Sequence, residues 1–87
     1  MDNTPRYKII KSFGILSKME DGCTHEFRLV NWNGKGEKYD IRWWGSQGKK
    51  ASPSGTTLTL KELQILKEIL INMELPDIEE EKHERTV

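Results

Sequence analysis

Short segments of β-type sequence fill the first half of the chain. Residues 7–18 are rich in β-branched and aromatic side chains, with apolar positions of both parities, which favours a curved or bulged strand that bends at Gly14. A turn signal at 20–22 precedes a second β-prone run over 24–33. The dipeptide Asn33-Gly34 then predicts a hairpin turn into a third strand over 38–44.

Alternation along the third strand divides its side chains into two sets. Successive side chains of a strand point to opposite faces, so Tyr39, Ile41 and Trp43 share one face and form a candidate core. The other face carries Lys38, Asp40, Arg42 and Trp44. A flat ring beside a guanidinium suits single-stranded nucleic acid, because bases stack on the ring and phosphates meet the charge.

A polar stretch and then a helical pattern follow the third strand. Residues 45–55 have almost nothing to bury and predict a loop, after which 56–58 are expected to add a short fourth strand. Thr59 and Glu62 have the spacing of a capping box, which predicts a helix that begins at about Leu60 and extends to Met73. The pattern therefore predicts an α+β fold, with four strands followed by one C-terminal helix.

The apolar side chains of this helix cover a wide arc. At ~100° per residue they sweep about 160°, more than the stripe that one packing surface needs. A second packing partner is implied, and the simplest one is the same helix of another copy in a two-fold dimer. The expected interface residues are Leu66, Ile69, Leu70 and Met73.

Length and charge then define the domain and its ends. The 87 residues, 34% of them apolar, fit one small domain over residues 7–75, between a flexible N-terminus (1–6) and a disordered acidic tail (76–87). Residues 1–73 hold 12 Lys/Arg against 8 Asp/Glu, whereas residues 74–87 hold 2 against 6. The basic excess of the folded part suits an anionic partner, and we expect the tail to be solvated.

Composition also argues against several classes of function. Cys23 is a lone cysteine, and no Cys and His pair has metal-ligand spacing, so neither a disulfide nor a metal site is expected. No Ser-His-Asp signature, phosphate-binding glycine loop or paired-carboxylate motif indicates an enzyme, a cofactor or a small-molecule substrate. Without a signal peptide or membrane span, a cytoplasmic location is expected, nucleoid-associated if the source is bacterial.

Three sequence features together resemble a known family. They are Val30-Asn31-Trp32-Asn33, the run Lys38-Tyr39-Asp40-Ile41-Arg42 with Trp44, and Gly55-Thr56-Thr57-Leu58-Thr59 with Glu62. Their order and spacing over residues 8–73 resemble the transcriptional coactivator family called positive cofactor four, and its bacterial YdbC-type members most. The resemblance implies a curved four-stranded antiparallel sheet followed by one C-terminal helix. It also implies a dimer that is joined partly through the helices and binds single-stranded DNA with little sequence preference.

The resemblance also implies roles for individual residues. Trp32 and Trp44 match the family's stacking aromatics, and Arg42 matches a cation that contacts the nucleic-acid backbone. Family members usually carry a lysine or arginine directly before the glycine at position 55, where this chain has Ser52-Pro53-Ser54, so a weaker or differently placed site is expected. Further candidate phosphate contacts are Lys38, Lys49, Lys50 and Arg28.

Each feature also has a plainer interpretation. The tryptophans can instead pack in the core or in a dimer interface, and Arg42 can simply pair with Asp40 on the same face. We expect a non-enzymatic homodimer that binds single-stranded DNA, with RNA as a second candidate ligand, and that acts in transcription or DNA maintenance. The alternative is a dimeric protein-protein interaction module that docks through an exposed tryptophan patch.

Overall fold

The structure is a computed structural model that describes residues 6–45 and 47–78 of the chain. Four strands come first, β1 (Tyr7–Lys18), β2 (Thr24–Trp32), β3 (Glu37–Gly45) and β4 (Lys50–Leu58), followed by one helix, α1 (Leu60–Ile71). The predicted fold class is thereby confirmed. The expectations for a flexible N-terminus and a disordered tail fall mostly on residues 1–5 and 79–87, which lie outside the described residues.

The strands form a simple antiparallel meander in the order β1-β2-β3-β4. The pairing of β2 with β3 is continuous from Thr24 opposite Trp44 to Asn31 opposite Glu37. Asn33 and Gly34 both have positive φ, 55° and 71°, in the turn that joins these strands. An Asn-Gly pair adopts such angles at little cost, which explains why the predicted hairpin forms here.

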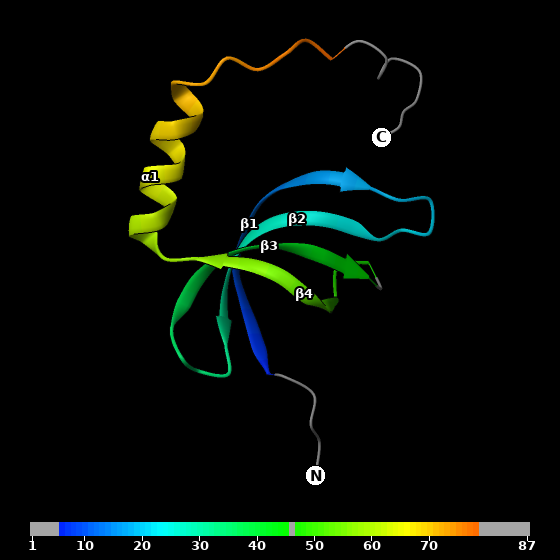
Figure 1. Cartoon of the computed structure of the whole chain (residues 1–87). Helices are drawn as coiled ribbons and strands as arrows, with labels where there is room; N and C mark the ends of the chain where they lie inside the picture. Colours follow the sequence, from blue (N-terminus) through cyan, green and yellow to red (C-terminus); the bar gives the residue numbers. More distant parts are fainter. Residues whose placement is uncertain (1–5, 46, 79–87) are drawn as a thin grey trace.

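The sheet is strongly bent, and β1 has the irregularities that allow the bend. Its pairing with β2 shifts register at three places, between Ile9 and Lys11, between Ser12 and Gly14, and between Ile15 and Ser17. Each bulge adds a residue to one strand and increases its local twist. Figure 1 shows the strands curving from the β2–β3 hairpin at the lower left over to the loops on the right. The prediction of a bulged, curved first strand is confirmed.

The fourth strand is longer than the sequence predicts. Residues 50–54 were expected to belong to a loop, but β4 begins at Lys50. Two backbone segments pair with β3 on either side of an irregularity, Ala51 opposite Trp44 and Gly55 opposite Arg42. Pro53 lies in that irregularity, at the edge of the sheet, where the amide it lacks is not needed. Backbone pairing with β3 therefore forms a strand where side-chain propensity predicts none.

The helix begins as its capping box predicts. The Thr59 hydroxyl accepts from the Glu62 amide at 3.1 Å, and the Glu62 carboxylate accepts from the Thr59 amide at 2.9 Å. The α1 helix stands to one side of the sheet (Figure 1), and none of its residues is buried. Within the described part of the chain, no helix is long and apolar enough to cross a membrane.

The most buried side chains lie on the face opposite to the expected core. Trp44, Val30 and Asp40 are 0% exposed, whereas Tyr39, Ile41 and Trp43 are only half-buried. The parity assignment for β3 is correct, but the assignment of the Trp43 face as interior is wrong for the single chain. The reason is geometric: the bend folds the Trp44 face onto itself, while a single helix covers the other face incompletely.

Candidate nucleic-acid interface

Side chains at even-numbered positions of β2 and β3 share the face inside the bend of the sheet, hereafter the concave face. In β2 they are Thr24, Glu26, Arg28, Val30 and Trp32. In β3 the covered ones are Asp40, Arg42 and Trp44. Two carboxylates, two arginines and two indoles thus lie close together. The carboxylates and guanidinium groups of this covered face need partners, because removing a charged group from water is costly.

The first group of partners is Asp40, Arg42 and Trp32. The Arg42 guanidinium binds the Asp40 carboxylate through Nε, at 2.9 and 3.0 Å from its two oxygens, and through Nη2 at 2.9 Å. Its Cζ atom lies 4.5 Å from the centre of the Trp32 ring. This is a charge-assisted pair that also makes a cation–π contact, so both the position and the plane of the guanidinium are fixed.

The second group repeats this arrangement with Glu26, Arg28 and Trp44. Arg28 binds Glu26 Oε1 through Nε and Nη2, each at 2.8 Å, and its Cζ lies 4.3 Å from the centre of the Trp44 ring. Burial alone would raise the pKa of Glu26, but hydrogen bonds from Thr24 and Arg28 and the Arg28 charge hold it below its ordinary value. Glu26 is therefore an ionised, structural carboxylate.

Three side chains of this region hold the start of β4 and the turn before it. Arg28 Nη1 donates to the Gly48 carbonyl at 3.1 Å, and Arg42 Nη1 donates to the Ser52 carbonyl at 2.9 Å. The Tyr7 hydroxyl donates to the Lys49 carbonyl. These bonds fix the backbone of the segment that carries Lys49 and Lys50, while both lysine side chains are exposed to solvent.

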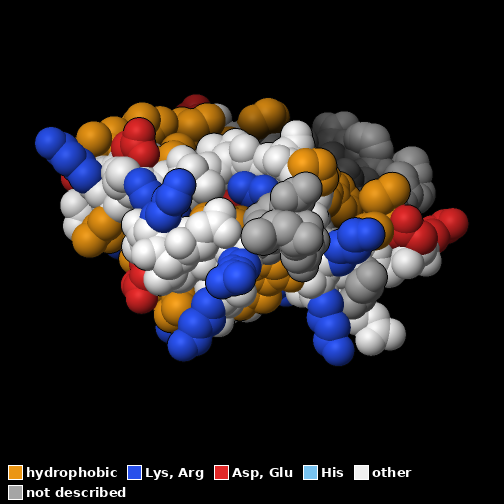
Figure 2. Space-filling view, turned by 90° about the horizontal axis from the view of Figure 1, so that it is seen from below, with side chains coloured by type: hydrophobic (Ala, Val, Ile, Leu, Met, Phe, Trp, Pro, Cys, Tyr) orange, Lys and Arg blue, Asp and Glu red, His pale blue; other side chains and the backbone are white. Residues whose placement is uncertain are grey.

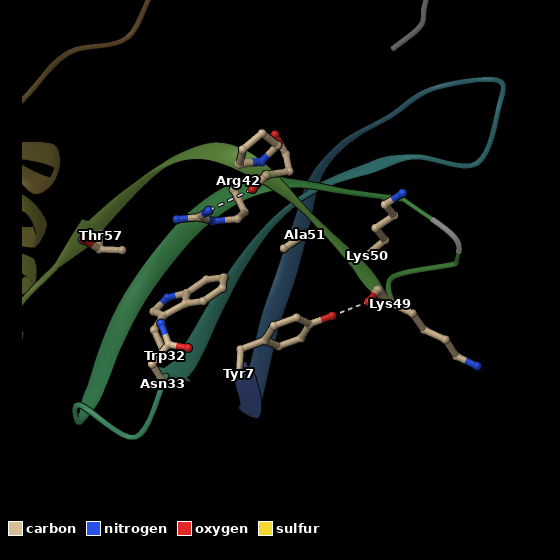
Figure 3. A pocket seen from close by; sticks show the side chains of 10 residues that line it. Tyr7, Trp32, Asn33, Arg42, Lys49, Lys50, Ala51 and Thr57 are labelled. Carbon is tan, nitrogen blue, oxygen red and sulfur yellow. Dashed lines mark hydrogen bonds between the residues drawn. The ribbon is translucent and has the colours of Figure 1, made fainter. Parts of the chain in front are cut away.

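A groove of about 660 Å³ lies between β4 and the hairpin end of β2. Its lining includes Tyr7, Trp32, Asn33, Arg42, Lys49, Lys50, Ala51, Ser52, Pro53 and Thr57. Figure 3 shows the Trp32 ring and the Tyr7 ring inside the bend, with the Arg42 side chain on the β4 side of Trp32. The Trp32 ring is half-buried and contributes an aromatic surface to this groove.

The sequence-predicted residues fall into two sets. The structure brings Trp32, Arg42, Lys49 and Lys50 together around the groove. The other set, Trp44, Arg28 and Lys38, shares the concave face but does not line the groove. Trp44 has no exposed surface, which contradicts the expectation that this ring offers an open face to a base. Arg28 forms an ion pair with Glu26 and a hydrogen bond with the Gly48 carbonyl, and Lys38 is exposed at the hairpin end.

Some groove and support residues were missed by sequence reasoning. Tyr7 packs against Trp32 and Trp44, with 5.4 Å between ring centres in each case. Its position gave no signal, because the bulges of β1 erase the alternation of faces. The pairing of Glu26 with Arg28 could have been predicted, because residues two apart on one strand lie on the same face.

Lys and Arg side chains are spread over the side of the molecule that is seen from below in Figure 2. They project from several parts of this face, with the Asp and Glu side chains mainly towards its ends. The charges of Arg28 and Arg42 are paired internally. The charge available to an anionic ligand at the groove therefore belongs mainly to Lys49 and Lys50.

The opposite face and the helix are apolar and incompletely covered. A second cavity, of about 560 Å³, lies between them and is lined by Leu16, Phe27, Ile41, Leu63, Leu66, Lys67, Leu70 and Ile71. Of the expected interface residues, Leu66 is half-buried, whereas Ile69, Leu70 and Met73 are exposed. These side chains are accessible to a partner, as the predicted interface requires.

Comparison with known proteins gives a relative for most of the chain. No family model matches the sequence. An uncharacterized protein of Treponema pallidum (strain Nichols) is 39% identical over 69 residues, which cover 79% of this chain and 80% of the relative. Identity at this level over most of both chains indicates common descent. The chain therefore belongs to the same protein family as this Treponema pallidum protein.

Proposed function

We propose that the protein is a non-enzymatic homodimer that binds single-stranded nucleic acid in the groove of its concave face. One observation carries the proposal: a half-buried tryptophan ring, Trp32, lines a groove whose rim carries Lys49 and Lys50. Stacking on the ring is independent of base identity, and the lysines attract phosphates. The resemblance to the positive cofactor four family supports the same function, with a role in transcription or DNA maintenance in the cytoplasm or nucleoid.

Burial argues against the alternative of a tryptophan docking patch. Trp44 is 0% exposed and Trp32 is partly covered by Arg42 and Tyr7, so little continuous aromatic surface is available to a protein partner. A hot spot of a protein interface normally needs a larger exposed anchor. A groove that is lined by the Trp32 and Tyr7 rings and has cationic edges is better matched to a thin, charged strand.

The test is a titration of a labelled oligo-dT with the full chain. Binding should weaken steeply between ~50 and ~200 mM salt, because phosphate contacts release counterions, whereas an apolar docking site should hardly respond. A duplex of the same length should bind more weakly, since its bases are not free to stack. Oligo-dT and duplex affinities that are equal, or independent of salt, would contradict the proposal.

Matched tryptophan variants identify the site. Trp32→Ala should weaken oligo-dT binding about five- to a hundredfold, since base–aromatic stacking contributes ~1–3 kcal/mol per base. Trp43→Leu is the control, because Trp43 lies on the opposite face, where it stacks on His25 with ring centres 4.9 Å apart. Equal losses in the two variants would place the site elsewhere.

A further inference from the structure

The guanidinium of Arg42 has little net charge to offer a ligand. Its side chain is 11% exposed, and the Asp40 side chain that binds it through both oxygens is 0% exposed. A third contact, from Nη1 to the Ser52 carbonyl, occupies the outer end of the group. A phosphate would have to compete with a buried carboxylate that has no other charged partner among the described residues, and breaking such a pair is costly.

Glycine at position 55 allows the side chain of Arg42 to lie flat against β4. Gly55 is directly opposite Arg42 in the β3–β4 pairing. A Cβ atom at Gly55 would meet Arg42 Cβ at 2.6 Å, Nε at 2.7 Å and Cζ at 2.8 Å. The pairing irregularity that follows Arg42 accompanies this close approach. Any side chain at position 55 would therefore push the guanidinium away from its present plane.

The Trp32 ring covers the guanidinium on the groove side. The Arg42 Cζ atom lies 4.5 Å from the ring centre, and Figure 3 shows the guanidinium between the Trp32 ring and the β4 ribbon. Gly55, Arg42 and Trp32 thus form successive layers from the sheet edge towards the groove. The planar guanidinium supports the indole ring over its surface, which a lysine side chain cannot do.

We infer that Arg42 is a positioning residue that, together with Asp40 and Gly55, holds Trp32 as a rigid stacking surface, and that Lys49 and Lys50 make the phosphate contacts. The inference rests on the proposed function and replaces the expected role of Arg42 as a backbone-contacting cation. A rigid ring binds a base without first losing its own conformational freedom. Gly55, which is not among the residues that line the groove, thereby becomes a determinant of affinity.

The test compares salt dependence across charge-changing and charge-neutral variants. Lys49→Gln should lower the slope of log affinity against log salt by about 0.7, the value expected for loss of one phosphate contact on a single strand. Arg42→Gln should leave the slope almost unchanged and lower the affinity at every salt concentration. Arg42→Lys, which keeps the charge, should also weaken oligo-dT binding at least about fivefold, at the lower end of the effect of one stacked base.

Gly55→Ala provides the independent arm, because it alters no charge. It should weaken binding about as much as Arg42→Lys, and the two losses should not add in the double variant, since both act through the same ring. Lys61→Gln on α1, an exposed lysine outside the groove lining, is the control for charge alone. Far-UV circular dichroism and thermal unfolding verify that each variant is folded at the temperature of the titration.

The outcomes separate the two proposals. If the unmodified chain does not bind oligo-dT, the proposed function fails, and this inference fails with it. If the unmodified chain binds but Arg42→Gln lowers the slope as Lys49→Gln does, Arg42 is a phosphate contact and only this inference is overturned. Wild-type affinity in a folded Gly55→Ala or Arg42→Lys protein would overturn it as well, whether or not Arg42→Gln folds.

Discussion

The two indole rings of the concave face differ in their exposure to solvent, and the difference separates folding from binding. Trp44 is 0% exposed, so Trp44→Ala should lower the free energy of unfolding by ~3–5 kcal/mol through lost contacts and the cavity that remains. Trp32 is only half-buried, and Trp32→Ala should destabilise the fold less. Urea unfolding followed by circular dichroism measures both, and equal destabilisation would contradict the assignment.

The Glu26 carboxylate, which pairs with Arg28, should make the stability of the fold depend on pH. The pKa of Glu26 lies below its ordinary value of 4.5 in the folded chain, because hydrogen bonds from Thr24 and Arg28 outweigh the effect of burial. A carboxyl group with a lowered folded pKa stabilises the fold above its unfolded pKa, and this stability is lost as pH falls through the folded value.

Acidification should therefore destabilise the unmodified chain more than a variant without this group. Between about pH 6 and pH 3, the midpoint of thermal unfolding should fall further for the unmodified chain than for Glu26→Gln. Glu26→Gln itself should be less stable at pH 6, because Arg28 loses its charged partner in a buried place. Parallel pH profiles for the two proteins would show that Glu26 has no part in the pH dependence.

Among the elements, those with local signals were predicted and those formed by pairing were not. The Asn33-Gly34 turn and the Thr59–Glu62 cap are encoded in a few adjacent residues, and both form as predicted. The first half of β4 depends on β3 for its backbone partners, and its sequence, Lys50-Ala51-Ser52-Pro53-Ser54, contains no β signal. Pairing between distant segments decided its structure.

Curvature limited the prediction of the site in a similar way. Alternation along β3 correctly placed Arg42 and Trp44 on one face. It predicts the face to which a side chain points, but not how deeply that side chain is buried. How deeply Trp44 is buried depends on the bulges of β1 and on the Tyr7 and Arg28 side chains that cover it. The close approach of Gly55 to Arg42 likewise depends on register, which no local pattern specifies.

The helix start provides a test at the level of one element. Thr59→Ala removes the hydroxyl that accepts from the Glu62 amide and should lower the stability of the fold by ~1 kcal/mol. Thr59→Ser keeps the hydroxyl and is the matched control. Chemical unfolding measures the difference, and helix content is followed at 222 nm. If Ala and Ser variants have the same stability, the capping box contributes nothing to the fold.

Within the described part of the chain, several large apolar side chains of the helix and of the neighbouring sheet face are exposed. Exposed fractions reach 53% for Ile69, 51% for Leu70 and 61% for Leu16, and these residues belong to the helix and to the face of the sheet beside it. Contiguous apolar surface of this kind typically marks an interface. The concave groove lies on the other face, so a second copy could pack against the helix side and leave both grooves accessible.

If the protein is a dimer of this kind, its mass in solution should be twice that of one chain, and a substitution in the interface should lower that mass. At micromolar concentration, sedimentation equilibrium should give twice the chain mass of 10.2 kDa. Leu70→Glu should shift the mass towards that of one chain, because a carboxylate in a dimer interface loses its water, whereas an exposed position in the monomer tolerates it. Gln64→Glu adds the same charge elsewhere on α1 and should remain dimeric. A monomeric unmodified chain would leave the apolar helix face without its proposed partner, and equal dissociation of both variants would point to net charge instead of this face.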